Sequence, residues 1–150
     1  MKCTFCDLVN GKKKSHLEGY PYIPLKSTKY SVSFLAADIP AHEEGHLLVI
    51  PKKHFRSLED MPPRILHDVI EHVSLASKVT RKRHSGCNIL LNNGKAAGQH
   101  EMHVHFHVIP RDPKDRIKVD VWKTRRISNK KYERVSEKLK KDFKNLSAFS

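Results

Sequence analysis

The stretch from His103 to Ile109 constrains the fold more than any other part of the sequence, because histidine and apolar residues alternate along it (His-Val-His-Phe-His-Val-Ile). Successive side chains of an extended chain point to opposite sides of a strand. We therefore predict a strand over about 102–109, in which Val104, Phe106 and Val108 face a core and the three histidines share the other surface. Because proline cannot continue a central ladder, Pro110 indicates that the histidines lie near an end of this strand.

Three imidazoles on one strand surface favour chemistry over simple solvation. A solvated face ordinarily carries Lys, Thr, Glu or Ser, whereas histidine titrates near neutral pH. The three rings cannot all bind one metal ion, since positions i and i+4 lie about 13 Å apart at ~3.3 Å per residue, so at most two could share an ion. The alternative is covalent catalysis, in which one imidazole attacks an electrophile while its neighbours position it and donate protons.

The segment just before the strand, Gly94–His100, is suited to anionic oxygens. Gly94 and Gly98 let backbone N–H groups approach a ligand closely, and Gln99 and His100 add side-chain donors. Most glycine-bearing loops are only turns, but the position of this one directly before the histidines makes phosphorus a plausible electrophile.

The pattern His-φ-His-φ-His-φ-φ, with φ apolar, is complete here and resembles the signature of the histidine triad (HIT) family of nucleotide hydrolases and transferases. Three further stretches agree with that family: Cys3–Gly11, Ala37–Pro40 and Gly45–His54. The resemblance extends from residue 3 to about 123 and is closest to the zinc-bearing microbial type of histidine triad nucleotide-binding protein, which has an ending like Val121–Thr124.

The resemblance implies a nucleophile and a set of phosphate contacts. His105 would attack the α-phosphorus of a nucleoside polyphosphate or phosphoramidate and form a nucleotidyl-histidine that water resolves. His107 would contact the phosphate near the leaving group, and His46 would support the nucleophile from a neighbouring strand. Further phosphate contacts would come from Asn92, Gly98, Gln99 and His100, with Gln99 also counted as catalytic. His100 stands where many relatives have Ser or Thr.

For the nucleoside, the resemblance implies that Asp38 accepts the ribose hydroxyls, because a carboxylate accepts two hydrogen bonds readily. The alternative for Asp38 is an ordinary turn residue before Pro40. Side chains that match the wall of the base slot, and that could each be plain core residues, are Phe5, Leu8, Ile39 and Leu48.

Cys3 and Cys6 have two possible interpretations, a redox pair and half of a metal site. A thioredoxin-like pair follows a strand, and nothing before Cys3 could form one. Zinc needs two more ligands to complete a tetrahedral site. The resemblance implies that these are His54 and His103, with His46 as the competing candidate, and that the zinc is structural. No organic cofactor is expected.

The remaining sequence predicts an α+β domain. Strands are indicated over 30–36, 46–50 and 87–92, in addition to the histidine strand. Asp60 can cap a helix that starts near Pro62–Pro63 and ends near 83–86, with apolar residues three and four positions apart. A second, carboxyl-terminal helix is indicated by Tyr132, Val135, Leu139, Phe143 and Leu146. The resemblance sharpens this to a HIT-like fold: an antiparallel sheet of about five strands with a central helix, usually as a homodimer.

Charge and composition add limits. The 150 residues are expected to form a single HIT domain whose last part, about 124–150, is a basic helical extension. The net charge is +13, and residues 111–150 hold 14 Lys and Arg against 6 Asp and Glu. This basic part is either a solvated surface or a rim that draws in polyanions, so nucleic-acid binding stays a minor hypothesis. Without an apolar span or leader, the protein is expected in the cytoplasm, with the nucleus possible. Surface positions are expected for five further histidines: His16, His42, His67, His72 and His84.

Taken together, the sequence predicts a HIT-type purine nucleotide hydrolase or nucleotidyltransferase that acts at the α-phosphorus of phosphoramidate or adenylate-type substrates. Three alternatives stay open. One is a dinucleoside polyphosphate hydrolase, another is a nucleotide-binding scaffold protein with little turnover, and the third is a metallohydrolase that uses His103 and His105 on a catalytic ion.

Overall fold

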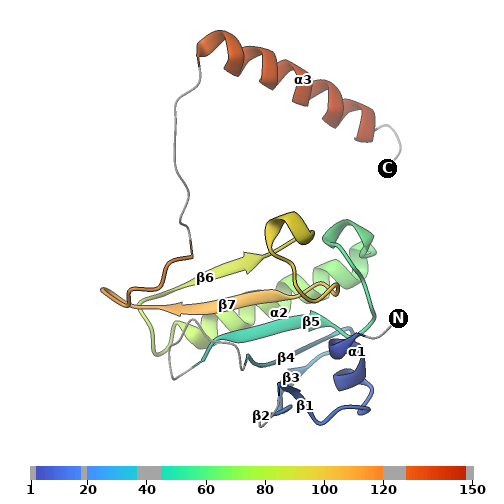
Figure 1. Cartoon of the computed structure of the whole chain (residues 1–150), viewed down its shortest axis with the longest axis vertical. Helices are drawn as coiled ribbons and strands as arrows, with labels where there is room; N and C mark the ends of the chain where they lie inside the picture. Colours follow the sequence, from blue (N-terminus) through green and yellow to red (C-terminus); the bar gives the residue numbers. More distant parts are fainter. Residues whose placement is uncertain (1–2, 18–19, 37–44, 120–127, 148–150) are drawn as a thin grey trace. The chain divides into compact units, whose positions relative to one another are not determined.

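The computed structural model describes residues 3–17, 20–36, 45–119 and 128–147. Its centre is an antiparallel sheet of five strands, in the order β3 (Pro24–Ser27), β4 (Ser31–Leu35), β5 (Leu47–Pro51), β7 (Phe106–Arg111) and β6 (Gly86–Leu91). Helix α2 (Pro63–Thr80) runs along one face of this sheet (Figure 1). The short helix α1 (Thr4–Val9) and a two-stranded ribbon, β1 (Ser15–Leu17) and β2 (Tyr20–Pro21), precede it. The predicted α+β class and five-stranded sheet with a central helix are confirmed.

The alternation of side chains along the strands builds one core on each face of the sheet. Leu48 and Ile50 of β5 belong to a buried cluster with Phe5 and Leu8 of α1, whereas Val49 belongs to a second cluster. That second cluster joins α2 to the other face of the sheet and includes Val69, Val73, Ala76, Val104, Phe106 and Val108. The predicted core positions Val104, Phe106 and Val108 are therefore buried as expected.

The histidine strand begins later than predicted. β7 starts at Phe106 and not near residue 102, so His103, Val104 and His105 lie just before it. The reason is that the pairing of β5 with β7 ends at Val49↔Phe106, and the backbone N–H of Val104 instead donates to the carbonyl of Phe55 at 2.8 Å. β7 also continues through Pro110, which pairs with Cys87 of β6 at a point where β5 no longer flanks the strand. A proline is tolerated there because its missing N–H faces no partner strand.

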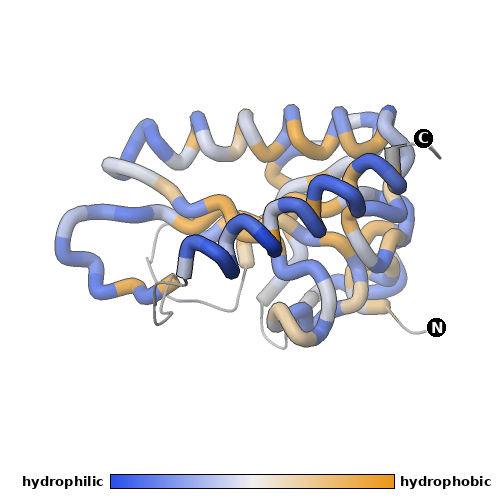
Figure 2. Tube along the Cα trace, turned by 90° about the horizontal axis from the view of Figure 1, so that it is seen from above, coloured by the Kyte–Doolittle hydropathy of each residue, from blue (hydrophilic) through white to orange (hydrophobic). Residues whose placement is uncertain are grey.

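Helix α2 has the predicted amphipathic character, and Figure 2 shows its hydrophobic positions gathered on the side of the sheet. Its ends differ from the prediction. Asp60 does not cap α2, because its carboxylate accepts from the backbone N–H of Ser57 in a preceding 3₁₀ turn, and the N-cap position is taken by Pro62. The helix ends at Thr80 and not near 83–86. The carbonyl of Thr80 accepts from the N–H groups of Arg83 and His84, so the residues after it form a turn and do not continue the helix.

The other strand predictions are confirmed with ends shifted by one residue, as β4, β5 and β6. Helix α1 and the strands β1, β2 and β3, which are short, were not predicted from the sequence. β3 is an edge strand that begins with Pro24, and an edge position is where proline is compatible with a sheet.

Residues 120–150 form a second compact unit, distinct from the first unit of residues 1–119. Its helix α3 (Asn129–Ser147) confirms the predicted terminal helix. The apolar side chains of its stripe are exposed, for example Tyr132 at 65% and Phe143 at 72%. Over the described ranges, no helix combines the length and the apolar character needed to cross a membrane.

Candidate active site and metal centre

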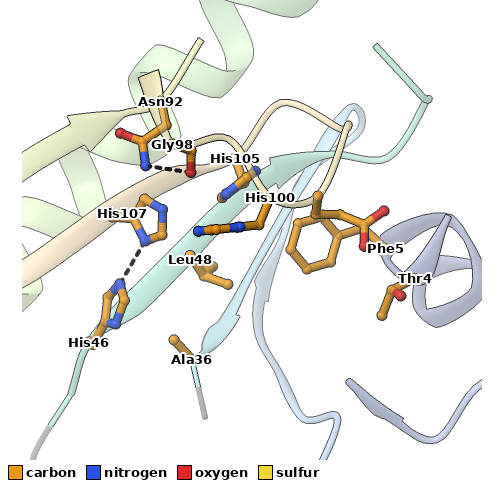
Figure 3. A pocket seen from close by; sticks show the side chains of 11 residues that line it. Thr4, Phe5, Ala36, His46, Leu48, Asn92, Gly98, His100, His105 and His107 are labelled. Atoms are coloured by element: carbon orange, nitrogen blue, oxygen red, sulfur yellow. Dashed lines mark hydrogen bonds between the residues drawn. The ribbon is translucent and has the colours of Figure 1, made fainter. Parts of the chain in front are cut away.

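A cavity of about 350 Å³ opens on the face of the sheet that carries the histidines (Figure 3). It lies where α1, the starts of β5 and β7, and the loop after β6 meet. Of the sequence-predicted residues, Phe5, His46, Leu48, Asn92, Gly98, His100, His105 and His107 line it. Three lining residues were missed by the sequence analysis, namely Thr4, Ala36 and Glu101, although each is adjacent in sequence to a residue or segment that it named.

His105 has a defined tautomer. Its Nδ1 lies 2.7 Å from the carbonyl oxygen of His103, and a carbonyl can only accept, so Nδ1 carries the proton. Burial lowers the pKa of His105 below its usual range, which keeps the ring neutral near pH 7. The lone pair therefore resides on Nε2, the nitrogen that a nucleophilic imidazole needs.

His46 and His107 form a second pair. Nε2 of His46 lies 2.9 Å from Nδ1 of His107, and the two rings stack with centroids 5.0 Å apart. Burial, with smaller contributions from the charges of His105 and His46, lowers the pKa of His107 to about 4. From the sequence, His46 is expected to support His105. In the structure, Nε2 of His46 lies within hydrogen-bond distance of Nδ1 of His107, because β5 pairs Leu48 with His107 and so brings His46, two residues earlier, beside that ring.

The loop after β6 is held by its own side chains. Gly94 and Gly98 have positive φ values of 96° and 85°, which favour glycine. The side-chain oxygen of Gln99 accepts from the N–H of Gly94 at 2.7 Å, and its amide nitrogen donates to the carbonyl of Arg56 at 2.9 Å. Gln99 is buried and does not line the cavity, so its hydrogen bonds stabilise the loop without contacting the cavity. At the cavity wall, Asn92 donates to the carbonyl of Gly98 at 3.3 Å.

Two of the residues predicted to form the base slot line the cavity. Phe5 and Leu48 line the cavity, and the Phe5 ring meets the His105 ring edge-on at a centroid distance of 5.3 Å. Leu8 is buried in the core beside Phe5 and does not reach the cavity. Asp38 and Ile39 lie outside the described residues.

The four predicted metal ligands, Cys3, Cys6, His54 and His103, come together in the structure, with all donor atoms within 4.8 Å of one another. The Sγ atoms of Cys3 and Cys6 lie 3.4 and 3.6 Å from Nδ1 of His103, and Sγ of Cys6 lies 3.4 Å from Nδ1 of His54. A tetrahedral zinc holds sulfur and nitrogen ligands about 3.6 Å apart, given Zn–S of ~2.3 Å and Zn–N of ~2.0 Å. The cysteines are free thiols, so the donor set fits zinc in kind and in spacing.

The contacts around this cluster support a metal-binding arrangement. Nε2 of His103 donates to the carbonyl of Pro51 at 2.9 Å, which leaves Nδ1 as the lone-pair nitrogen beside the thiols. Burial lowers the pKa of His103 to about 4, so this nitrogen is unprotonated. The same burial raises the pKa of the Cys3 thiol to about 12, and a bound cation would counteract that effect.

Among the remaining histidines, the predicted surface position is wrong for His72 and for the side chain of His84. His72 is buried between α2 and β4, where Nδ1 lies 2.8 Å from Ser31 Oγ and Nε2 lies 2.9 Å from Ser33 Oγ. His67 is exposed as expected, whereas the side chain of His84 is 8% exposed and pairs with Asp112 at 2.7 Å. His42 lies outside the described residues.

Comparisons with known proteins agree with this geometry. The model of the HIT domain family matches residues 26–114. The adenosine 5′-monophosphoramidase of Schizosaccharomyces pombe is 32% identical over 145 residues, which cover 96% of this chain and 100% of that protein. A histidine triad nucleotide-binding protein from Candida albicans has a similar structure, with a TM-score of 0.81 and 30% identity over 97% of this chain and 99% of that one.

A zinc-bound histidine triad family protein from Mycobacterium smegmatis is also similar, with a TM-score of 0.68 and 31% identity over 79% of this chain and 81% of that one. The family match covers more than half of the sequence and includes the whole histidine pattern. This chain therefore belongs to the HIT domain family.

Proposed function

We propose that this HIT protein is a purine nucleotide hydrolase that acts at the α-phosphorus through a nucleotidyl-histidine on His105, with phosphoramidates or adenylates as substrates. The observation that carries the proposal is the hydrogen bond from Nδ1 of His105 to the carbonyl of His103, because it leaves the Nε2 lone pair for attack in a cavity lined by further donors. The name of the S. pombe relative, adenosine 5′-monophosphoramidase, supports the choice of an adenosine phosphoramidate.

In the first step, the Nε2 lone pair of His105 forms a bond to the α-phosphorus, and the bond from phosphorus to the leaving amine breaks. The electron pair of the broken bond goes to the amine. We assign protonation of this amine to His100, an exposed imidazole at the cavity. Nδ1–H of His105 keeps its hydrogen bond to the carbonyl of His103, which stabilises the positive charge on the substituted ring.

In the second step, a water oxygen attacks the phosphorus and the bond from phosphorus to Nε2 breaks. The electron pair returns to Nε2, and the proton of the water passes to His100, which restores both groups. Balanced in this way, one substrate and one water yield one nucleoside monophosphate and one amine.

The remaining side chains of the cavity hold the phosphate. When Nε2–H of His46 donates to Nδ1 of His107, the proton of the His107 ring resides on its own Nε2, which can donate to a phosphate oxygen. Asn92 adds a donor at the same wall, through the amide N–H that does not bond the carbonyl of Gly98. The backbone N–H of Gly98 donates to the carbonyl of Lys95, so Gly98 shapes this wall through its backbone conformation. Donors of this kind are most effective when they are held in place before charge develops. Phe5 and Leu48 pack against the base, Asp38 binds the ribose and Ile39 completes the slot in this proposal.

Zinc in this protein would be held by Cys3, Cys6, His54 and His103, and would supply folding free energy and no reaction chemistry. This distinguishes the proposal from a metallohydrolase. We also propose that two copies associate, as the family resemblance implies.

The test is turnover of adenosine phosphoramidate, followed as AMP release. His105→Asn should abolish turnover while changing the Kd of AMP by less than about tenfold, which corresponds to roughly 1.4 kcal/mol. Acid quenching of the wild-type protein should trap a nucleotidylated chain, and the His105→Asn protein should yield none. Turnover that persists in His105→Asn would contradict the proposal, and a wild-type protein that binds AMP without turnover would favour a scaffold role.

A further inference from the structure

The Cys3–Cys6–His54–His103 cluster and the cavity share the same short helix. Cys3 and Cys6 flank Thr4 and Phe5, and both of these inner residues line the cavity. α1 has only six residues, and a helix of that length is not stable by itself. Its position therefore depends on its side-chain anchors, which are the core residues Phe5 and Leu8 and the two cysteines.

Cys3 also organises the first turn of α1. Its Sγ atom accepts from the backbone N–H of Cys6 at 3.5 Å, so one sulfur serves both the cap of the helix and the cluster. Groups that fix this sulfur in space consequently fix the start of the helix and the residue next to it, Thr4.

Phe5 connects the cluster to the proposed nucleophile. Its ring meets the His103 ring at a centroid distance of 5.7 Å and the His105 ring at 5.3 Å, edge-on in both cases. A displacement of α1 would therefore move the ring that limits the cavity next to His105.

His103 provides a second connection, through its backbone. Its side chain faces the thiols through Nδ1, while its carbonyl accepts the Nδ1 proton of His105. Because residues 103–105 precede β7, the sheet ladder does not hold them. Their anchors include the backbone hydrogen bonds from His103 to Glu101 and from Val104 to Phe55, and the side chain of His103.

We infer that the four-ligand cluster is a positioning device for the nucleotide site: when one metal ion draws these side chains together, they hold the Phe5 wall and the His103 carbonyl in the geometry that binds the nucleotide. The inference rests on the proposed function, and goes beyond it by predicting that the metal and nucleotide sites are energetically coupled. A purely structural metal would raise stability and leave the nucleotide affinity of the folded protein unchanged.

The primary test measures AMP binding by titration calorimetry in zinc-loaded and metal-free protein. We expect metal removal to weaken AMP binding about tenfold, within the usual range of coupling between sites. By thermodynamic reciprocity, saturating AMP must strengthen zinc binding by the same factor, which a competition titration with a chromogenic chelator measures. Equal AMP affinities with and without metal would overturn the inference.

Two variants identify the route. Phe5→Leu in zinc-loaded protein should weaken AMP binding and make the remaining affinity less sensitive to metal, a non-additive result that a double-mutant cycle detects. Cys6→Ser should lose zinc, lower the Tm and reproduce the metal-free AMP affinity without chelator. Cys87→Ser, a matched substitution of a thiol outside the cluster, should leave the zinc content and the AMP affinity unchanged. Strictly additive effects of Phe5→Leu and metal removal would exclude the Phe5 route.

If the metal-free chain unfolds, two measurements on zinc-loaded protein test the inference. They are the Kd of AMP for Phe5→Leu and the zinc affinity of the wild-type protein with and without AMP. An AMP Kd unchanged by Phe5→Leu, or a zinc affinity unchanged by AMP, would then contradict the inference. Failure of the proposed function is distinguishable, because it would appear as absent turnover in zinc-loaded wild-type protein, whereas failure of the inference would appear as AMP binding that the metal does not change. A wild-type chain that binds no zinc would also overturn the inference.

Discussion

At the residue scale, one backbone carbonyl decides which nitrogen of His105 is available. The carbonyl of His103 selects the Nδ1–H tautomer, and burial keeps the ring neutral by lowering its pKa. The histidine pattern in the sequence identifies the ring, but the choice of nitrogen depends on the backbone just before β7, where the chain leaves the ladder.

Glu101 supports a prediction at the same scale. It is an acidic residue at the wall of a cavity that we propose for an anionic phosphate. Glu101→Gln keeps the size of the side chain and removes its charge, so we expect the KM for adenosine phosphoramidate to fall about two- to tenfold through loss of charge repulsion. Steady-state kinetics at low salt measure this effect. Glu71→Gln, an exposed change on α2, is the control, and an unchanged or higher KM for Glu101→Gln would contradict the expectation.

At the scale of elements, a buried polar network joins α2 to β4. Ser31 Oγ donates to Asp68 Oδ2 at 2.6 Å, so it must accept from Nδ1–H of His72, and Ser33 Oγ then donates to Nε2 of that ring. The neutral ring satisfies every partner. Burial lowers the pKa of His72, Asp68 opposes this shift, and the positive charges of Lys26 and Lys52 add to it.

The network predicts a pH dependence of stability. Below the unfolded-state pKa of about 6.5, the unfolded chain binds a proton at His72 that the folded chain resists, so the free energy of unfolding falls as pH is lowered, by at most about 1.4 kcal/mol per pH unit for one group. Urea unfolding at pH 7.5 and 5.5 measures the difference. His72→Gln should reduce this pH dependence, because its amide does not titrate, although lowered pKa values at His105 and His107 add to it in both proteins. Identical pH dependence in the two proteins would show that His72 contributes nothing.

At the scale of the whole molecule, the chain divides into a sheet domain and a basic carboxyl-terminal unit. α3 has an apolar stripe whose side chains are exposed and a polar surface rich in lysine. Surface lysine mainly maintains solubility, and the residues that line the proposed nucleotide site all belong to the first unit.

We therefore expect charge reversal on α3 to leave catalysis on small substrates nearly unchanged. Changing Lys130, Lys131, Lys138, Lys141 and Lys144 to Glu should alter kcat/KM for adenosine phosphoramidate by less than about threefold, since salt near 0.15 M screens the field of exposed surface charges. A dinucleoside polyphosphate assayed at low and high salt is the comparison substrate. A loss of more than about tenfold on the small substrate, at unchanged Tm, would instead assign α3 a role in steering polyanions.

Local periodicity in the sequence was enough to predict the strands β4 to β7 to within a few residues, the amphipathic helices and the core positions Val104, Phe106 and Val108. The gathering of Cys3, Cys6, His54 and His103 was also expected, although from the family resemblance and not from periodicity.

The partners of individual side chains became known from the three-dimensional structure and not from the sequence. His46 and His107, 61 positions apart in the sequence, form a hydrogen-bonded pair, and His72 is buried between α2 and β4. The side chain of Gln99 bonds the backbone of its own loop, and Thr4 and Glu101 line the cavity. The physical reason is that a hydrogen bond or a buried position depends on which distant segments meet, and the packing of α1, α2 and the sheet sets those meetings, whereas local patterns specify only the face on which a residue lies.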